Sequence, residues 1–405
     1  MGVVEPRKND PTVQIDGLRI CRGRLNGFSV TGGGVIGCAA ARELAPDHRV
    51  LLLERDQIAS GATARAAGEV TMEPSYTDYP EIADYATDFF RRYDGTGSFE
   101  YTQTPSAELV TPDREDEARA RVDRLRKDGV EVAFLEPSEV EDRWPQIDPS
   151  SFAGAVRFTD TGHLDPYTLT TTLQSDAEAH DARFETGVTV TEILEDGERV
   201  TGVDTEDGAI RSDNVLVATG WRVNELLTPI LEVPIRPYRT QCLVLRPDSS
   251  LSDAFPMGWI PGEHVYFRRE GNGDLLVGGW SFAEDDPTAA SERADEAFQD
   301  HVAGLVPRFL RADGRLRVVD GWAGIDGATP DTRPIIDSPA DAPDGLVIAA
   351  GFHGRGVMSA PVAGRLVRCL TTGEDPPVPT RPFSLSRFDS RSPDFEFLSI
   401  SAGGD

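Results

Sequence analysis

The chain has 405 residues and 39% of them are hydrophobic, so it is long enough for two domains with substantial cores. Its formal net charge is −29, which argues against binding to nucleic-acid phosphates or anionic membranes. There is no apolar run of membrane-spanning length, no signal-peptide hydrophobic stretch and no metal-like cysteine spacing. We therefore expect a cytoplasmic protein with reduced cysteines, no metal site and no membrane span.

The excess of acidic residues also bears on the environment of the protein. Lys8 and Lys127 are the only lysines, and the repulsion among so many acids is screened by salt. We expect an adaptation to a salty cytosol, such as that of a halophilic archaeon. An ordinary acidic protein from a GC-rich genome is the alternative.

Residues 1–27 form a basic, turn-rich leader, opposite in charge to the rest of the chain. A flexible extension or a mis-assigned start codon explains this leader better than a nucleic-acid-binding arm does.

A glycine fingerprint of the form G-x-G-x-x-G follows the leader, between a β-prone run and a helix-prone run, and a second apolar run ends in an acid. In chain order these are residues 28–31, then Gly32, Gly34 and Gly37, then residues 39–45, 50–53 and Glu54. The acid lies about 20 residues after the glycines, as in dinucleotide-binding βαβ units. The glycines permit a tight turn and a close approach to a pyrophosphate, and Glu54 would bind ribose hydroxyls. A chance cluster of glycines is the alternative.

The segment after Glu54 distinguishes between dinucleotides. Residues 60–70 read SGATARAAGEV, an irregular run of small residues that lets the chain wrap closely around a ligand, whereas a nicotinamide enzyme continues with further strands and helices. Four further matches follow in order: GHLDPYTLT at 162–170, FETGVTVTEI at 184–193 with NVLVATGW at 214–221, PIRPYRTQ at 234–241, and WAGIDGATPDTRPII at 322–336 with GFHGRGVMSAPVAGRLV at 351–367. Together they resemble the FAD-dependent amine oxidoreductases of the D-amino-acid oxidase superfamily, particularly the sarcosine oxidase, dimethylglycine dehydrogenase and glycine oxidase branch.

The resemblance implies an α/β fold, α+β overall, in which a Rossmann-like FAD-binding domain built from discontinuous segments adjoins an antiparallel-sheet substrate domain. We assign residues 28–90, 150–225 and 315–375 to the FAD-binding domain, 91–149 and 226–314 to the substrate domain, and 376–405 to a surface tail. Residues 234–245, 264–269 and 274–280 read as strands of the antiparallel sheet. Residues 115–127 read as a charged, solvated helix.

The resemblance also implies a set of FAD-binding residues. Val188 would pair with adenine through its backbone, although taken alone it is an ordinary core valine. The strand at 346–350 and the helix starting near Gly356 would place a helix N-terminus against the flavin, with a plain glycine-rich turn as the alternative. Arg65 could reach a phosphate or the substrate, or be an exposed structural arginine. The full set is Gly32, Gly34, Val35, Ile36, Gly37, Glu54, Arg55, Ser60, Ala62, Thr63, Arg65, Ala67, Gly68, Val188, Thr219, Gly220, Gly324, Gly354, Arg355, Gly356, Val357 and Met358.

Three departures from the family pattern affect the chemistry. Gly324 stands where monomeric sarcosine oxidases tether the flavin through a cysteine, so we expect non-covalent FAD. Met358 stands where related oxidases carry a lysine that assists oxygen, so reaction with oxygen is in doubt. Asp326 replaces the arginine that binds a substrate carboxylate in D-amino-acid and glycine oxidases. Another cation would then be needed, and the candidates are Arg239, Arg268, Arg269 and Arg355.

The expected activity is oxidation of the C–N bond of a small secondary amine or D-amino acid, such as sarcosine, dimethylglycine or glycine, to an imine by hydride transfer to flavin. No acid–base motif is required, because a deprotonated amine can lose its hydride directly. His264 is a further candidate for lining the pocket, and each lining candidate taken singly is more readily packing or surface. The residues expected at the reacting centre are Tyr266, Trp280, Arg268, His353, Arg355 and Met358.

Two alternatives remain open. The same scaffold could oxidise a hydroxy acid or glycerol phosphate. The chain could also be a flavoprotein subunit that needs a partner chain, because its WAGI segment at 322–325 resembles the β subunit of heteromeric sarcosine oxidases. The electron acceptor, oxygen or a carrier, and any homo-oligomeric state are not specified by the sequence.

Overall fold

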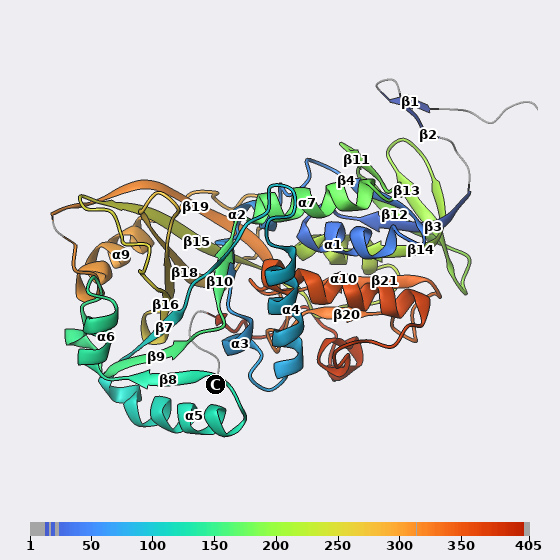
Figure 1. The fold of residues 1–405 in the computed structure, drawn as a ribbon. Coiled ribbons are helices and arrows are strands. Elements are labelled where there is room, and N and C mark those ends of the chain that lie inside the picture. Colours follow the sequence, from blue (N-terminus) through green and yellow to red (C-terminus); the bar gives the residue numbers. More distant parts are fainter. Residues whose placement is uncertain (1–12, 16–17, 21–23, 313, 401–405) are drawn as a thin grey trace, which may run out of the picture.

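Two eight-stranded sheets lie side by side and divide the structure into two lobes (Figure 1). The structure is a computed structural model, and it describes residues 13–15, 18–20, 24–312 and 314–400. Within the leader, β1 (Val13–Ile15) and β2 (Leu18–Ile20) pair antiparallel. The flexible extension is expected over 1–27, of which 1–12, 16–17 and 21–23 lie outside the described residues. Residues 24–27 belong to a strand of the first sheet, so the expectation is wrong there.

The first lobe contains the glycine fingerprint and a mostly parallel sheet. Strand β3 pairs in parallel with both β4 and β14, and β14 also pairs in parallel with β21. The strands are β3 (Arg24–Thr31), β4 (Arg49–Glu54), β11 (Arg183–Thr186), β12 (Val190–Glu195), β13 (Val200–Thr205), β14 (Ile210–Val217), β20 (Ile335–Asp337) and β21 (Leu346–Ala350).

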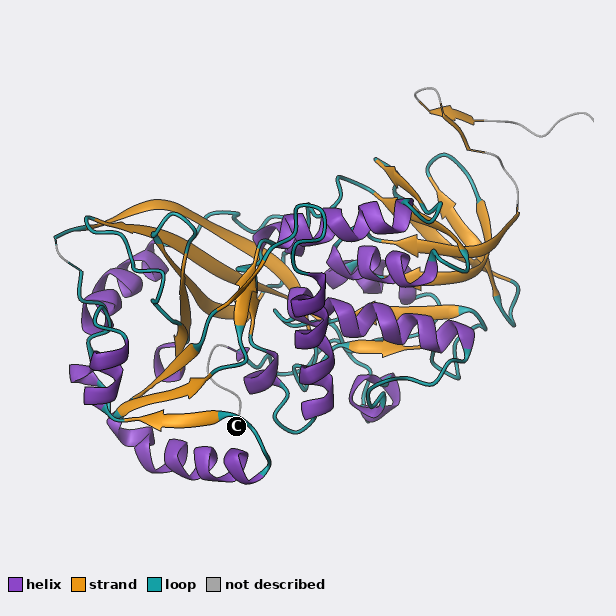
Figure 2. Ribbon diagram, in the orientation of Figure 1, coloured by secondary structure: helices purple, strands orange, loops and turns teal. Residues whose placement is uncertain are grey.

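Helices cover one face of this sheet, as the purple ribbons of Figure 2 show. The sheet is buried on both faces, which is why its central strands read as continuous apolar runs. In β4, Val50 and Leu52 pack against the helices, while Leu51 and Leu53 pack into a second core on the opposite face. The helices of the first lobe are α1 (Val35–Leu44), α2 (Ala62–Arg65), α3 (Met72–Ser75), α4 (Pro80–Tyr93), α7 (Pro166–Glu178), α8 (Val223–Leu227) and α10 (Gly356–Thr372).

The second lobe is a largely antiparallel sheet, as the sequence predicts. Its order is β19-β15-β18-β17-β16-β7-β9-β8, and only the β16–β7 pairing is parallel. The strands are β7 (Ser106–Val110), β8 (Val132–Leu135), β9 (Gly154–Phe158), β15 (Arg236–Pro247), β16 (Met257–Ile260), β17 (Val265–Arg269), β18 (Leu275–Ala283) and β19 (Leu316–Ala328). Helices α5 (Glu115–Lys127), α6 (Pro137–Arg143) and α9 (Glu296–Phe309) accompany them.

The boundaries between the lobes differ from the expected ones in two places. Strands β9 and β19 belong to the second sheet, although residues 150–225 and 315–375 were assigned to the FAD-binding domain. The chain therefore crosses between lobes after these strands, and strand propensity does not reveal which sheet a strand joins. Three short strands form a small third sheet. In sheet order they are β5 (Glu69–Val70), β10 (Gly162–Leu164) and β6 (Tyr101–Gln103), and β10 follows β9 in the chain.

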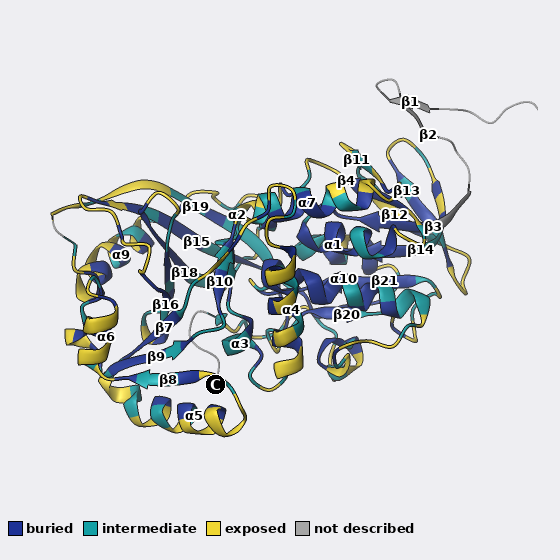
Figure 3. Ribbon diagram, in the orientation of Figure 1, coloured by how far each residue is buried: buried dark blue, intermediate teal, exposed yellow. Residues whose placement is uncertain are grey.

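The expectation of a surface tail at 376–405 is wrong for several of its described residues. Phe383 and Leu385 are fully buried, and Figure 3 shows buried segments after α10. The ring of Phe397 stacks on Tyr238 and on His353, with centroid distances of 5.2 and 5.4 Å. These contacts are made by single apolar residues in a segment that is otherwise rich in proline and serine. The overall composition of the segment therefore does not reveal that these residues are buried.

Candidate active site

A cavity of about 1150 Å³ is lined by residues of both lobes. Small-molecule pockets usually measure about 300–1000 Å³, so this one can hold a dinucleotide together with a small substrate. Every residue of the expected FAD-binding set except Gly37 lines it. Within the described residues, no group of acids, histidines and cysteines is arranged to hold a metal ion, and no helix is long and apolar enough to cross a membrane.

At one end of the cavity, the glycine fingerprint leaves room for a ligand beside the backbone. Gly32 has a φ of +111°, and a side chain there would collide with the Ala218 carbonyl. A side chain at Gly37 would overlap the Gly32 carbonyl oxygen, so Gly37 serves packing and lies behind the cavity wall. Gly34 is the N-cap of α1 and provides no capping side chain, which leaves the helix N-terminus available to an anion.

Glu54 holds a fixed position at the end of β4. Its two carboxylate oxygens accept backbone hydrogen bonds from Gly33 at 2.6 Å and from Asp56 at 2.8 Å. Each oxygen keeps a lone pair for a further donor, such as a ribose hydroxyl. Val188 donates its own N–H to the Glu54 carbonyl at 3.0 Å. The Val188 N–H is therefore occupied, and the expected backbone pairing with adenine would have to use the Val188 carbonyl.

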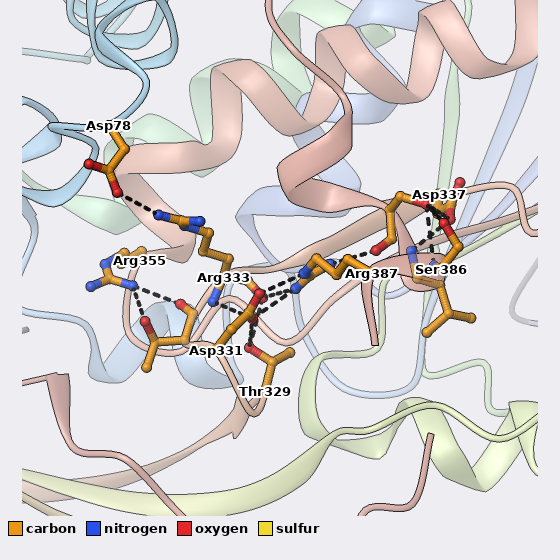
Figure 4. Close-up of polar contacts among 11 residues, drawn as sticks. Asp78, Thr329, Asp331, Arg333, Asp337, Arg355, Ser386 and Arg387 are labelled. Atoms are coloured by element: carbon orange, nitrogen blue, oxygen red, sulfur yellow. Dashed lines mark hydrogen bonds and ion pairs between the residues drawn. The ribbon is translucent and has the colours of Figure 1, made fainter. Parts of the chain in front are cut away.

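At the other end of the cavity, the loop before α10 carries Arg355, and its guanidinium is anchored on one side. Nη1 of Arg355 donates to the carbonyl and hydroxyl oxygens of Thr332 at 2.7 and 3.0 Å (Figure 4). The nearby Arg333 instead donates from Nη2 to Oδ2 of Asp78 at 3.4 Å. Burial lowers the pKa of Arg355. Of the four cations considered for a substrate carboxylate, Arg355 alone lines the cavity, because Arg239, Arg268 and Arg269 bind backbone carbonyls and acids elsewhere.

Three of the six residues expected at the reacting centre line the cavity, namely Tyr266, Arg355 and Met358, and three do not. Trp280 is turned away by a β-bulge: Gln241 pairs with Gly279 and Arg239 with Phe282, so two residues of β18 face Thr240 alone. The Trp280 ring packs on Phe298 and His301, and Ser281 reaches the cavity in its place.

His353 and Arg268 are also displaced from the expected reacting centre. His353 is fully buried between Tyr238 and Phe397, and burial lowers its pKa to about 4, so the imidazole is neutral at neutral pH. Arg268 lies behind the wall, where its Nε donates to the Ala67 carbonyl at 2.7 Å. His264 is exposed at a turn.

Several cavity residues were missed by the sequence analysis. Helix α5 was expected to be a solvated surface, yet Arg121, Arg124 and Leu125 from it line the cavity, and Arg121 pairs with the buried Glu108. Its three buried residues at helical spacing, Ala118, Val122 and Leu125, are the signal that one face is covered. Glu69 and Ile400 also line the cavity; Glu69 lies in the small-residue segment 60–70 but was not singled out, and Ile400 lies outside every quoted segment.

The cavity fits FAD by its own features. Thr219 has a buried hydroxyl without a hydrogen-bond partner among the described residues, and it lines the cavity beside Gly220. A Cβ at Gly324 would lie 2.6 Å from the Cβ of Arg65, so this position accepts no larger residue without movement. No cysteine or histidine is among the described residues that line the cavity, which leaves no thiol or imidazole for a covalent link there.

A glycine-rich βαβ unit that opens into a long cavity beside an antiparallel sheet defines a dinucleotide-dependent oxidoreductase with a substrate lobe. The comparison with known families specifies the dinucleotide. The model of the DAO family, FAD dependent oxidoreductase, matches residues 29–370, so the chain belongs to this family.

Known proteins resemble the chain over most of its length. It is 28% identical to a glycine oxidase of Pseudomonas aeruginosa over 88% of this chain and 97% of that protein. It is also 28% identical to the formaldehyde-forming 4-methylaminobutanoate oxidase of Paenarthrobacter nicotinovorans over 83% of this chain, but spans only 42% of that relative. Among solved structures, L-proline dehydrogenase from P. horikoshii superposes with a TM-score of 0.82 at 25% identity, covering 90% of this chain and 98% of that one.

Proposed function

We propose that the protein oxidises the C–N bond of a small secondary amine or amino acid to an imine, which water then hydrolyses. Sarcosine, dimethylglycine, glycine and similar compounds are the candidate substrates. The observation that carries the proposal is that the fingerprint glycines Gly32 and Gly34 line the same cavity as Tyr266, Ala323 and Met358. The names of the glycine oxidase, 4-methylaminobutanoate oxidase and L-proline dehydrogenase relatives support an amine or amino-acid substrate.

Different residues along the cavity would bind the cofactor, stabilise charge and enclose the substrate. Glu54 and the N-terminus of α1 would hold the ribose and pyrophosphate of non-covalent FAD. When bound, FAD supplies the acceptor for a hydride from the substrate carbon. Arg355 and the N-terminus of α10 would place positive charge where negative charge develops during this transfer. Tyr266 and Met358 would enclose the substrate and exclude water.

The direct test is anaerobic mixing of the FAD-loaded protein with a panel of amines and with hydroxy acids, including glycerol phosphate, while the flavin absorbance is followed. Bleaching by secondary amines or amino acids supports the proposal. If only a hydroxy acid or glycerol phosphate bleaches the flavin, amine oxidation is refuted and the protein oxidises an alcohol group instead.

A second candidate, a flavoprotein subunit that requires a partner chain, is favoured by one feature of the second lobe. Strand β19 is the edge of the sheet, and Val318 and Val319 on it are 53% and 42% exposed. An exposed apolar edge strand invites pairing with another chain. Size-exclusion chromatography of native protein, with and without co-purifying chains, separates this candidate from a self-sufficient enzyme.

We also propose that the protein works in a salty cytoplasm. The net charge of −29 and the scarcity of lysine support this environment, and its test is the salt dependence of stability argued in the Discussion.

A further inference from the structure

Glu69 is a carboxylate in the wall of the cavity that none of the roles above uses. It follows Gly68 directly and begins β5, where it lies opposite His163 in the antiparallel pairing with β10. It lines the same cavity as Tyr266 and Met358. Besides burial and Cys242, the charge of Glu69 raises the pKa of Tyr266, so the carboxylate lies near Tyr266 in the cavity wall.

The carboxylate is buried and incompletely satisfied. Oε1 of Glu69 has no hydrogen-bond partner among the described residues. Burial raises the pKa of Glu69 to about 8, against the opposing effect of Arg268. Buried carboxylate oxygens in folded proteins almost always have a donor, and an exception in a cavity is typical of a group that meets a ligand.

The ionisable neighbours of Glu69 are already engaged. The guanidinium of Arg268 donates to the Ala67 and Arg269 carbonyls and pairs with Glu270 at 3.1 Å. On the second sheet, the Tyr266 hydroxyl lies 3.4 Å from Sγ of Cys242, and burial raises the pKa of both groups. Burial lowers the pKa of His163, across the β5–β10 pairing, to about 4, so its ring is neutral. Glu69 as a whole is only half-buried and lines the cavity, so its carboxylate can meet a cationic donor there.

We propose that Glu69 binds the ammonium group of the substrate amine and accepts its proton before the hydride leaves, an inference that rests on the proposed amine oxidation. An N–H bond of the ammonium breaks, its proton forms the carboxylic acid of Glu69, and the nitrogen keeps the electron pair. The C–H bond then breaks with both electrons going to the flavin, while the nitrogen pair forms the C=N bond of an iminium ion. Water adds to that ion and releases a carbonyl compound and an amine.

The role has a specific pH signature. Because the acceptor must be ionised, kcat/KM with an ammonium substrate falls as the pH drops through the pKa of Glu69. It also falls at high pH, once free substrate loses its own proton. Without the carboxylate, only the neutral amine reacts, so kcat/KM of the variant rises with pH and reaches a plateau without a decline.

The experiment compares Glu69→Gln with a matched control, Glu73→Gln, by anaerobic stopped-flow reduction across the pH range with an amine that bleaches the wild-type flavin. Glu73 also has a buried, unpartnered carboxylate oxygen, and burial raises its pKa to about 7, but it is not among the cavity-lining residues. We expect Glu69→Gln to react at least about tenfold more slowly at neutral pH, as for loss of a proton acceptor, and to lose the bell-shaped profile. Glu73→Gln should keep that profile.

A Glu69→Gln variant with the wild-type profile and rate would overturn the role of Glu69 and leave amine oxidation standing. Failure of every amine to bleach the wild-type flavin would instead refute the proposed function itself. If Glu69→Gln does not retain FAD, Glu69→Asp tests the role of Glu69 instead, because aspartate keeps a carboxylate as proton acceptor but on a shorter side chain. We expect the acidic limb of its profile to persist with a shifted midpoint, and an unshifted midpoint contradicts the proposal.

Discussion

Asp326 is hydrogen-bonded to Gly354, and the bond joins the last strand of the second lobe to the loop that begins α10. Oδ2 of Asp326 accepts the Gly354 N–H at 2.7 Å, while Oδ1 accepts the Gly327 N–H at 2.8 Å. From the family resemblance, we expect this aspartate to stand where related oxidases bind a substrate carboxylate with an arginine. In this chain the position therefore fixes the loop that carries Arg355 and is not available to bind an anionic substrate group.

Asp326→Asn should destabilise the protein, because an amide has one acceptor oxygen and leaves one of the two backbone donors unpaired. The expected loss in the free energy of unfolding is about 1–3 kcal/mol, measured by denaturant titration of the FAD-loaded protein. Asp320→Asn on the same strand is the control, since Asp320 is exposed. Equal effects of the two substitutions would show that the Asp326–Gly354 link is unimportant.

FAD should leave the protein on acid denaturation. No described cysteine or histidine lines the cavity. From the family resemblance, we also expect Gly324 to stand where monomeric sarcosine oxidases carry the tethering cysteine. After acid precipitation and centrifugation, all flavin absorbance is expected in the supernatant. A yellow pellet that stays yellow through washing would reveal a covalent link through another residue.

Glu54→Ala should weaken FAD binding. The substitution removes a charge-assisted acceptor for the ribose, worth about 1.5–3 kcal/mol, so the Kd should rise by at least about tenfold, equivalent to about 1.4 kcal/mol. Fluorescence titration of the apoprotein gives the Kd, and circular dichroism checks that the variant is folded. Glu54 also accepts the Gly33 and Asp56 N–H groups, and Glu54→Gln keeps one of these two acceptors, so Glu54→Gln should raise the Kd less than Glu54→Ala does. An unchanged Kd in Glu54→Ala contradicts the ribose role.

Salt should stabilise the protein at neutral pH. Repulsion among charges that sum to −29 is screened when the Debye length falls to about 3 Å at about 1 M salt. The melting temperature should therefore rise with potassium chloride at pH 7, and much less near pH 4.5, the isoelectric point. A melting temperature that falls with salt at pH 7 would mean that the surface ion pairs outweigh the repulsion.

The sequence predicts the parts of the fold that local chemistry determines. The turn between β3 and α1 needs a positive φ at Gly32 and close backbone contacts at Gly32 and Gly37, which only glycine accepts, so it follows from the spacing of the glycines. Strand β21 and the start of α10 follow from an apolar run and a glycine-rich turn, and both occur where predicted. Helix α5 also has the predicted bounds, although one of its faces lines the cavity.

The remaining features depend on contacts between distant residues. Trp280 is turned from the cavity by a bulge whose register with β15 cannot be read from β18 alone. Glu69 lies near the end of a segment of small residues whose letters give no sign of a buried acid, and its position follows from the pairing of β5 with β10. Phe397 reaches His353 from the far end of the chain. Such contacts are set by tertiary packing, which overrides local propensity.

The reduced enzyme should react slowly with oxygen. Met358 is buried, and its sulfur lies 3.6 Å from the Thr71 hydroxyl, so the position offers no positive charge to favour superoxide formation. An artificial acceptor should therefore raise turnover well above the aerobic rate. Stopped-flow reoxidation of photoreduced enzyme measures the oxygen reaction directly.

Met358→Lys tests whether the missing charge is the cause, with Met358→Leu as the uncharged control. Burial lowers the pKa of a lysine, so the new ammonium is charged mainly at lower pH. Reoxidation of Met358→Lys should therefore be faster than wild type, most clearly toward lower pH, while Met358→Leu stays slow. Fast reoxidation of the wild type would contradict this assignment and indicate that another cation, with Arg355 the nearest candidate in the cavity wall, already provides the field.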